Sequence, residues 1–555
     1  MQIHFDGVRA YALLILLCTA LYIPGLTTLP PIDRDEARFV QATRQMIASG
    51  DYVRIRFQEE PRNKKPIGIY WFQAAMVKAL GASASGHIWP YRIPSFIGAT
   101  LAVLLTFAFG KRLIGSREAF LGAALLSASL LLIFEAHQAT TDAALLAAVV
   151  ASQGALSSLY LQNPKSKHGL GLAATFWVAQ GIGILIKGPI VPLIATLTIL
   201  TLVLIDRKAA WLKELRPLPG ILLVAFMVLP WGIAITKATG GTFFTDAIQN
   251  DLLPKLVSGQ ESHGFKPGYY LLLLPVTFWP ASMCIGLTLR DAWERRTCAP
   301  ERFCIAWILP AWILFELVPT KLPHYIMPTY PALALLTART VYAIQKENFQ
   351  WPRFWPRWGA AAVGSLAGIV ALAGIPSLPW FLDGRFDPLA LWPMAAATLT
   401  IGSTVWYIRR LKLSNALASA IVGAVLIFAP TFQMILPGVN SFWLSRSVAQ
   451  TISEHTASPG GLKRTIVAAG YHEPSLVFLM GTETGLISPE KAAETLHLQP
   501  GAIAIVSNKE EQAFLQKAQE LGLSLHLIRT LKGFHYSKGR MITLKIYDIQ
   551  PEPVS

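Results

Sequence analysis

The stretch PYRIPSFIGATLAVLLTFAFGKR, residues 90–112, decides the fold class of this chain. Its apolar run is close in length to the roughly 20 residues that an α-helix needs to cross about 30 Å of hydrocarbon. The basic pair Lys111 and Arg112 follows directly. Because short cytoplasmic loops of membrane proteins are rich in Lys and Arg, the stretch predicts a transmembrane helix that ends in the cytoplasm.

Comparable apolar runs recur up to residue 436, and by the same length rule they predict about 13 spans. The expected spans lie near residues 10–27, 90–110, 119–136, 142–160, 170–186, 189–205, 219–236, 269–288, 303–319, 325–342, 359–377, 389–407 and 415–436. Of the 555 residues, 53% are hydrophobic and only 14% are charged, which is too apolar for a soluble enzyme of this length. We therefore expect an α-helical polytopic membrane protein, with its membrane domain over residues 1–436. The first run should be retained as a span, since no small-residue cleavage site follows it.

Basic residues in alternate connections set the expected orientation. They are Lys111, Arg112 and Arg117; Lys165 and Lys167; Arg207, Lys208, Lys213 and Arg216; Arg290, Arg295, Arg296 and Arg302; Lys346, Arg353 and Arg357; and Arg409, Arg410 and Lys412. With these connections and the N-terminus in the cytoplasm, the other connections and the chain beyond residue 436 face outward. The net charge of +16 is thus explained by topology and anionic lipid, and we expect no nucleic-acid partner.

The longest outward connection within the membrane domain covers residues 28–89. Residues 35–49 have the pattern of an amphipathic helix. The apolar stretch 67–80 is long enough to be considered as a span, but counting it would reverse every later loop. We therefore expect it to lie on the membrane interface.

The chain changes character after residue 436. Short strands are expected over 464–469, 502–506, 523–528 and 541–549, with a helix over 510–521. This pattern predicts a small C-terminal α/β domain, residues 437–555, on the outer side. It contains neither a G-x-G-x-x-G nor a P-loop pattern, which argues against nucleotide binding. The four cysteines all lie in or beside apolar segments, so no disulfide framework or zinc site is expected.

Reactive polar residues gather at span ends rather than at span centres, and by this topology they share the outer face. They are Asp35, Glu36, Lys64, Lys65, Asp142, Lys187, His263, Lys321, His324 and Tyr325. A carboxylate can take a proton from an attacking hydroxyl, and ammonium groups can stabilise a departing phosphate. Such a face suits transfer from a lipid-phosphate carrier. A transporter would instead need ionisable groups near the middle of its spans.

Several motifs carry a family resemblance over roughly the first 340 residues. They are Asp35-Glu36-Ala37-Arg38-Phe39, Ala48-Ser49-Gly50-Asp51-Tyr52, Lys65-Pro66-Ile67-Gly68-Ile69-Tyr70-Trp71, Thr141-Asp142, Lys187-Gly188, His263 with Pro267-Gly268-Tyr269-Tyr270, and Lys321-Leu322-Pro323-His324-Tyr325-Ile326-Met327-Pro328. As a set they resemble the bacterial aminoarabinose lipid A transferases. These are relatives of the protein O-mannosyltransferases within the GT-C class of membrane glycosyltransferases.

The resemblance implies a role for each matching residue. Asp35 matches the catalytic base and Asp142 a second carboxylate of the cavity. Lys65 and Lys187 match lysines that hold the carrier phosphate, and Tyr325 matches an aromatic residue beside it. Further substrate-binding candidates are Arg38, Lys64, Lys321, His263 and His324. The partners implied are a polyprenyl-phosphate-linked sugar, a lipid or glycan acceptor and membrane lipids, at the outer face of a bacterial inner membrane.

Two positions depart from the family pattern. A glutamate that can hold a divalent metal together with the histidine at His263 is replaced by Lys64. The substitution adds a positive charge where a metal needs a carboxylate, so we expect no tightly bound metal and no other cofactor. The stretch Ile248-Gln249-Asn250-Asp251 lacks the arginine that often follows Ile-Gln in the lipid A enzymes. The acceptor therefore stays open between lipid A, protein and a surface polysaccharide.

Plainer interpretations of the same residues stay open as well. Asp35 can serve the helix dipole, and Asp33 is the neighbouring alternative for the base. Interfacial lysines can snorkel, Asp142 can cap a span, and a lone histidine can be structural. For the whole chain, the alternatives are a flippase for a lipid carrier, or a sensor whose C-terminal domain recognises a wall component.

Overall fold

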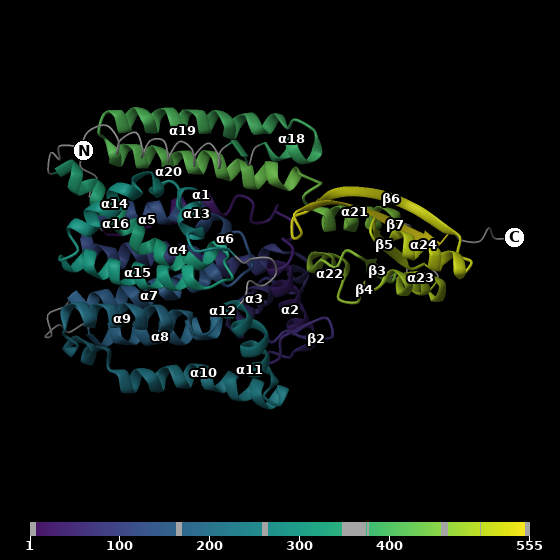
Figure 1. Ribbon diagram of the computed structural model, residues 1–555, viewed down its shortest axis with the longest axis horizontal. Helices are drawn as coiled ribbons and strands as arrows, with labels where there is room; N and C mark the ends of the chain where they lie inside the picture. Colours follow the sequence, from purple (N-terminus) through teal and green to yellow (C-terminus); the bar gives the residue numbers. More distant parts are fainter. Residues whose placement is uncertain are drawn as a thin grey trace.

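The computed structural model describes residues 7–161, 169–257, 265–346, 373–374, 377–456, 464–499 and 501–549. A bundle of long helices forms most of it, and a smaller α/β unit built from the last hundred residues lies at one end (Figure 1). The N-terminus lies at the opposite end of the bundle (Figure 1). The expected helical membrane fold with a small C-terminal sheet domain is confirmed.

The bundle helices follow the apolar runs closely. They are α1 (Val8–Tyr22), α4 (Trp89–Ile114), α5 (Ser116–Ser127), α6 (Leu130–Ala136), α7 (Asp142–Leu161), α8 (Gly169–Lys187), α9 (Ile190–Asp206), α10 (Pro217–Thr239), α13 (Tyr269–Thr277), α14 (Ile285–Glu294), α15 (Ala299–Leu317), α16 (Tyr330–Lys346), α19 (Leu391–Arg409) and α20 (Leu413–Pro430). Within the described ranges, six helices are long and apolar enough to cross a membrane, or eight if each of two bent pairs is one span. The chain is thus a multi-pass membrane protein, and the expected number of about 13 spans stays a prediction. The expected span 359–377 lies almost wholly outside the described residues.

Two expected spans are bent rather than straight. The run 119–136 forms α5 and α6, which meet at 61°. The run 269–288 forms α13 and a second helical segment, Ala281–Glu294, at 115°. The backbone amide of Leu130 donates to the carbonyl of Trp279 at 3.3 Å, so the two breaks lie against each other.

Helices α4 and α7 approach closely because small residues face each other. A Cβ added at Gly98 would lie 2.6 Å from the Cα of Ala144, so only glycine permits this contact. Ala143, Ala144 and Ala148 of α7 are buried. The tight packing holds the first turn of α7, which carries Asp142, against the rest of the bundle.

The connection between α1 and α4 folds as expected into two short helices, α2 (Asp35–Ser49) and α3 (Gly68–Leu80). Between them is a small hairpin of β1 (Arg56–Phe57) and β2 (Glu60–Pro61). Gly50 caps the C-terminal end of α2. It has a φ of 71° and donates its amide to the Met46 carbonyl, as glycines in the left-handed conformation commonly do at helix ends. Helix α3 has only 13 residues, too few to cross a bilayer alone.

The C-terminal unit is a mixed sheet with helices on it. Its strands are β3 (Ile466–Ala469), β4 (Gly485–Leu486), β5 (Ile503–Ser507), β6 (Leu525–His535) and β7 (Arg540–Ile549), in the order β4-β3-β5-β7-β6. Its helices are α21 (Leu444–Thr456), α22 (Pro474–Met480), α23 (Pro489–Leu498) and α24 (Glu511–Glu520). Strands β3, β4 and β5 are parallel, whereas β7 runs antiparallel to β5 and β6. The β6–β7 hairpin is longer than expected, and its turn reaches the helical bundle (Figure 1).

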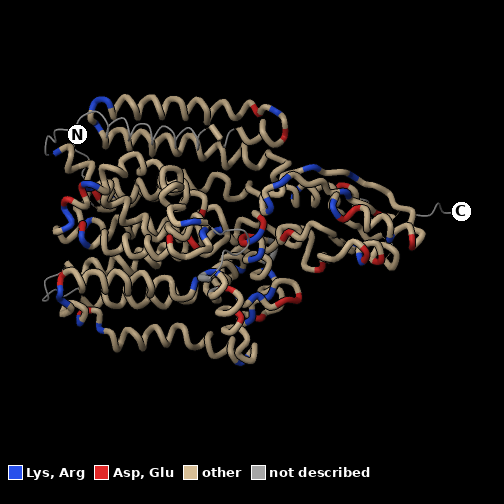
Figure 2. The backbone as a smooth tube through the Cα atoms, in the orientation of Figure 1, with Lys and Arg blue, Asp and Glu red and all other residues tan. Residues whose placement is uncertain are grey.

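The remaining described elements lie between these parts or at helix ends. They are α11 (Thr242–Asp246), the π-helix η3 (Ala247–Leu252), α12 (Leu253–Val257), α18 (Leu378–Asp383), and the short helices η1 (Ala82–Gly86), η2 (Ala210–Leu215), η4 (Ala281–Cys284), η5 (Pro323–Thr329), η6 (Pro388–Ala390), η7 (Thr431–Ile435) and η8 (Leu436–Gly438). Charged residues gather at the bundle ends and between the bundle and the C-terminal unit (Figure 2).

Candidate active site

A polar cavity of about 260 Å³ lies where the first outer connection meets the ends of several bundle helices. Most of the residues singled out by the sequence line this one cavity: Asp35, Arg38, Lys64, Lys65, Asp142, Lys187, His324 and Tyr325. They come from α2, the segment before α3, α7, α8 and η5, which are far apart along the chain.

Among the described residues predicted to bind substrate, Lys321 is not part of this lining. Lys321 is buried, and its ammonium donates to the carbonyl of Val318 at 2.6 Å. Its neighbours Thr320 and Leu322 line the cavity instead. His263 lies outside the described residues.

The cavity also contains polar residues to which sequence reasoning assigned no role: Arg62, Glu135, Asp251 and Lys255. In total, six Lys or Arg side chains among the described lining residues face four carboxylates. The site is therefore net positive, which favours an anionic ligand such as a phosphate.

Asp35 is the first residue of α2, and its side chain is open to the cavity, with 59% of it exposed. Arg62 Nη2 lies 3.9 Å from its Oδ1, and the Arg62 guanidinium sits over the Phe39 ring at 5.1 Å. Desolvation inside the cavity opposes ionisation of Asp35, but the charges of Arg62, Arg38 and His324 outweigh it, so its pKa lies below the usual value. At neutral pH Asp35 is a carboxylate ready to accept a proton.

Glu36, next to Asp35 in the sequence, is directed away from the cavity. It forms a fully buried ion pair with Arg92, at 2.8 and 2.9 Å, and accepts the backbone amides of Ile32 and Ala139. Arg92 also donates to the carbonyls of Leu26, Leu29 and Pro30. Glu36 has no access to a substrate, and its role is to hold the segment before α2.

Asp142 and Lys187 form an ion pair of 2.6 Å between the start of α7 and the end of α8. The Lys187 ammonium also lies 5.2 Å from the centre of the Tyr325 ring. This pair holds one cation and one carboxylate at the wall of the cavity. An incoming phosphate could take the place of Asp142 as the partner of Lys187.

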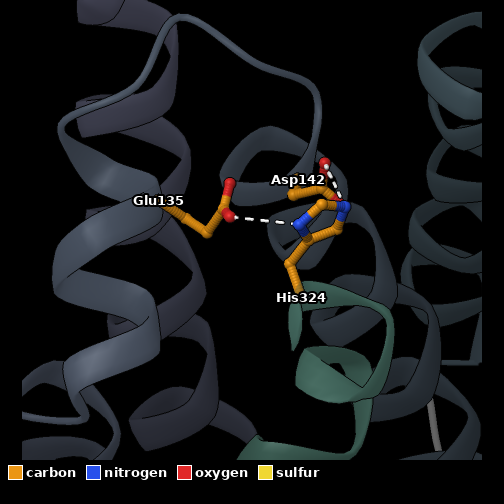
Figure 3. A group of neighbouring side chains, drawn as sticks. All are labelled: Glu135, Asp142 and His324. Carbon is orange, nitrogen blue, oxygen red and sulfur yellow. Dashed lines mark ion pairs between the residues drawn. The ribbon is translucent and has the colours of Figure 1, made fainter. Parts of the chain in front are cut away.

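His324 lies between Glu135 and Asp142 (Figure 3). Its Nδ1 is 3.4 Å from Glu135 Oε1 and its Nε2 is 3.8 Å from Asp142 Oδ2. The three side chains have ligand atoms within 4.8 Å of one another, so they could in principle hold a cation. Lys187 already neutralises Asp142, and its ammonium would oppose a metal ion at this position.

A second charge cluster joins the first outer connection to α12. Asp251 lies between two lysines, 2.9 Å from Lys65 and 2.5 Å from Lys255. Burial and the neighbouring Lys255 lower the pKa of Lys65 from 10.5 to about 8, although Asp251 opposes the shift. Asn63 donates to Asp246 of α11 at 2.9 Å, which fixes the same two segments beside each other.

An apolar cavity of about 600 Å³ lies close to the polar one. It runs between α3, α4, α7 and α8, and Phe72, Ile97, Ala147 and Val178 are among its lining residues. Ile186, the residue before Lys187, lines the same space. Consecutive residues of α8, Ile186 and Lys187, thus line the apolar and the polar cavity, and on α7 Ala144 and Asp142 do the same. The apolar cavity is a groove suited to a hydrocarbon chain.

Comparisons with known proteins agree with this fold. Residues 64–233 match the family described as dolichyl-phosphate-mannose-protein mannosyltransferase. An undecaprenyl phosphate-alpha-4-amino-4-deoxy-L-arabinose arabinosyl transferase of Pseudomonas aeruginosa is 30% identical over 334 residues, which are 58% of each chain. The corresponding protein of Edwardsiella ictaluri is 26% identical over 71% of this chain and 70% of its own. The alignment to the first of these relatives thus spans less than two thirds of its length.

Solved structures show the same architecture. ArnT from Cupriavidus metallidurans bound to undecaprenyl phosphate has a TM-score of 0.74 at 18% identity, covering 97% of this chain and 98% of that one. Its apo state has a TM-score of 0.72, with 96% and 97% covered. The GT-C fold expected from the sequence is confirmed, and so is the resemblance to the aminoarabinose transferases.

Proposed function

We propose that this chain, which has a GT-C fold and resembles the aminoarabinose lipid A transferases, is an inverting glycosyltransferase. It would move a sugar from a polyprenyl-phosphate carrier to a hydroxyl or phosphate of a lipid A-type acceptor. One observation carries the proposal: the Asp35 carboxylate and several cations line one cavity, beside an apolar groove.

The donor class is supported by the groove and by the names of the relatives. A polyprenyl chain needs an apolar surface, and the groove between α4, α7 and α8 ends beside Lys187. The similar transferases are named for undecaprenyl phosphate-linked aminoarabinose, and the Cupriavidus metallidurans structure holds undecaprenyl phosphate. In our proposal the carrier lies in the groove and its phosphate lies between Lys65 and Lys187.

In the transfer step, the acceptor oxygen attacks the anomeric carbon of the sugar. Its proton goes to Asp35, whose low pKa keeps it ionised before the reaction. The bond between the anomeric carbon and the phosphate oxygen breaks, and its electron pair leaves with polyprenyl phosphate. Attack opposite the leaving phosphate inverts the anomeric centre.

In this proposal, the Lys and Arg side chains of the cavity stabilise the leaving phosphate. Lys65, Lys187 and Arg38 would stabilise the negative charge that develops on the phosphate. Tyr325 would orient the Lys187 ammonium. Lys64 supplies a further positive charge. The proposal therefore needs no metal ion and no other cofactor.

We place the reaction on the periplasmic side of a bacterial inner membrane. Basic residues at the opposite end of the bundle, such as Lys111 and Arg112 in the last turn of α4, favour the cytoplasm for that end. The cavity and the C-terminal domain would then face outward together.

The test uses the full chain in vesicles with a radiolabelled polyprenyl-phosphate sugar and lipid A. We expect label to move to lipid A with the wild type, while Asp35→Asn gives at least about 100-fold less transfer. Asp33→Asn, two residues away, should keep most of the activity. Full activity of Asp35→Asn would exclude this carboxylate as the base.

Analysis of the labelled product separates the acceptors. Label in protein or polysaccharide from whole membranes, and none in lipid A, would replace the acceptor but keep the donor. Movement of the carrier across the vesicle membrane without any new glycosidic bond would instead show a flippase and overturn the proposal.

A further inference from the structure

We propose that the C-terminal domain positions the catalytic base, because its β6–β7 turn and α22 hold the two residues that precede Asp35. The inference rests on the proposed function, in which Asp35 is the base. It assigns Tyr536 and Ser475 as positioning residues that act through the backbone of Asp33 and Arg34. The domain would then belong to the catalytic apparatus rather than being an accessory.

Direct contacts join the domain to these two residues. The Asp33 backbone amide donates to the Tyr536 hydroxyl, and the Ser475 hydroxyl donates to the Asp33 carboxyl. Arg34 donates through Nη2 to the carbonyl of Ser537 at 2.5 Å. Asp33, just before α2, is therefore held by two residues that lie about 500 and 440 positions later in the chain.

The conformation of Arg34 explains why such support is needed. Its φ is 65°, in the left-handed region that a residue with a side chain rarely adopts. It immediately precedes the first residue of α2, and its side chain gives the helix no cap. Without outside contacts, this residue would tend to return to an ordinary φ, and the start of α2 would turn with it.

The orientation of the Asp35 carboxylate depends on the backbone conformation of the residues just before α2. Its side chain is mostly exposed to the cavity, and the ion pair with Arg62 is a long one of 3.9 Å. Side-chain contacts therefore restrain the carboxylate weakly. The position of its Cα at the start of α2 decides where the carboxylate points.

The supporting residues are themselves held firmly. Tyr536 stacks on Phe442, with ring centres 4.7 Å apart and planes 15° apart. The Ser475 hydroxyl also contacts Ser445 at 2.6 Å, and Ser445 contacts the Tyr471 hydroxyl at 2.8 Å. Both residues that contact Asp33 are thus held by further contacts within the C-terminal domain.

The hairpin can come this close because of a glycine. Phe534 donates its amide to the carbonyl of Ser441 at 2.7 Å. A Cβ added at the preceding Gly533 would lie 2.7 Å from that same carbonyl oxygen. Gly533 therefore allows the end of β6 to pack against the segment leading from the bundle into α21.

A second set of contacts fixes the body of α2 on the same domain. Arg44 donates to the carbonyl of Phe478 at 2.9 Å, and Gln41 donates to the Thr482 hydroxyl at 2.8 Å. Both partners lie in or just after α22. The domain therefore restrains α2 along its length as well as at its start.

Asp33 itself is suited to holding rather than to proton transfer. Burial and the nearby Glu473 raise its pKa well above the usual value of an aspartate. Its carboxyl accepts the Ser475 hydroxyl, and Asp33 is not among the described residues that line the polar cavity. This separates the roles of two aspartates that are two residues apart.

The experiment compares Tyr536→Phe/Ser475→Ala with Tyr547→Phe in the full chain. The control removes a hydroxyl from the same domain, one that contacts Glu511 at 2.9 Å far from α2. We expect the double variant to lower kcat about 10-fold or more with KM for the donor changed less than about 2-fold. Ser475→Thr, which keeps a hydroxyl, should retain activity.

Hydrogen–deuterium exchange of the peptide covering residues 30–40 gives a readout that needs no activity. The double variant should exchange faster there, and Tyr547→Phe should not. If the wild type transfers no sugar, the exchange result still decides whether the domain orders the start of α2. Unchanged kcat and unchanged exchange in the double variant would overturn the proposal, as would an equal loss of kcat in Tyr547→Phe.

Discussion

Arg92 and Glu36 form an ion pair in which neither side chain is exposed, and Glu36 is the residue directly after Asp35. The guanidinium also binds three carbonyls of the segment between α1 and α2. Removing one partner would leave a buried charge without compensation. The pair therefore holds the segment before α2 from the side of the helical bundle. The C-terminal domain holds the same segment from its other side.

Arg92→Met should destabilise the protein by about 3–5 kcal/mol, because Glu36 would lose its partner inside the protein. Thermal unfolding in detergent measures the change. Arg290→Met is the matched control, since the Arg290–Glu294 pair is about half exposed and contributes little. Equal effects of the two substitutions would contradict the structural role of the buried pair.

Carrier binding should depend on the charge of Lys65. Its pKa is lowered to about 8, so the ammonium loses its proton as the pH rises through 8. We expect the affinity for undecaprenyl phosphate to fall about 10-fold between pH 7 and pH 9. Lys65→Arg should bind equally well at both pH values, because arginine stays charged. A wild-type affinity that is flat over this range would argue against Lys65 as a phosphate ligand.

Filling the apolar groove should weaken binding of long-chain donors selectively. Ala147 lines the groove and is partly exposed, so Ala147→Phe would place a ring where we expect the polyprenyl chain. We expect KM to rise about 10-fold for a long-chain donor, through the loss of buried CH₂ groups. A short-chain analogue should be affected much less.

The control for this substitution is Ala418→Phe, at an exposed position of α20. It adds the same ring to the outside of the bundle and should leave KM unchanged. Equal effects on long-chain and short-chain donors would indicate that Ala147→Phe disturbs the site itself rather than the groove.

Much of the fold could be predicted because the bilayer imposes simple rules. Length and hydrophobicity placed α4, α7, α8 and α20 within a few residues. The sidedness given by the basic residues stays a prediction. The bends at α5–α6 and α13–α14 could not be predicted in this way. The two breaks meet through the Leu130 amide and the Trp279 carbonyl, a contact between distant segments that neither local sequence indicates. Only the second break has a strong local signal, Pro275 and Pro280.

The candidate site could also be predicted only in part from the sequence. Asp35, Lys65, Asp142 and Lys187 could be found because each matches a motif, and the last three also lie beside an apolar run. Arg62 could not, since its importance comes from its pairing with Asp35 in the folded chain. Lys255 pairs with Asp251 four residues before it, and that local pair joins the site only because Lys65 also binds Asp251. Lys321 has the same sequence signal as the others, yet its ammonium binds a nearby carbonyl instead of facing the cavity.

The junction between α2 and the C-terminal domain should weaken as the pH rises, because of Asp33. Its folded-state pKa is raised by burial and by Glu473, so the folded protein binds a proton that the unfolded chain has already lost. That stabilisation is complete below the ordinary pKa of 3.8 and is lost as the pH rises through the folded-state value. Asp33→Asn keeps an oxygen for Ser475 and never ionises. Its melting temperature should therefore match the wild type near pH 4 and exceed it by about 2–4 °C at pH 8. Glu494→Gln, at an exposed position, should show no such divergence, and parallel curves for Asp33→Asn and the wild type would refute the assignment.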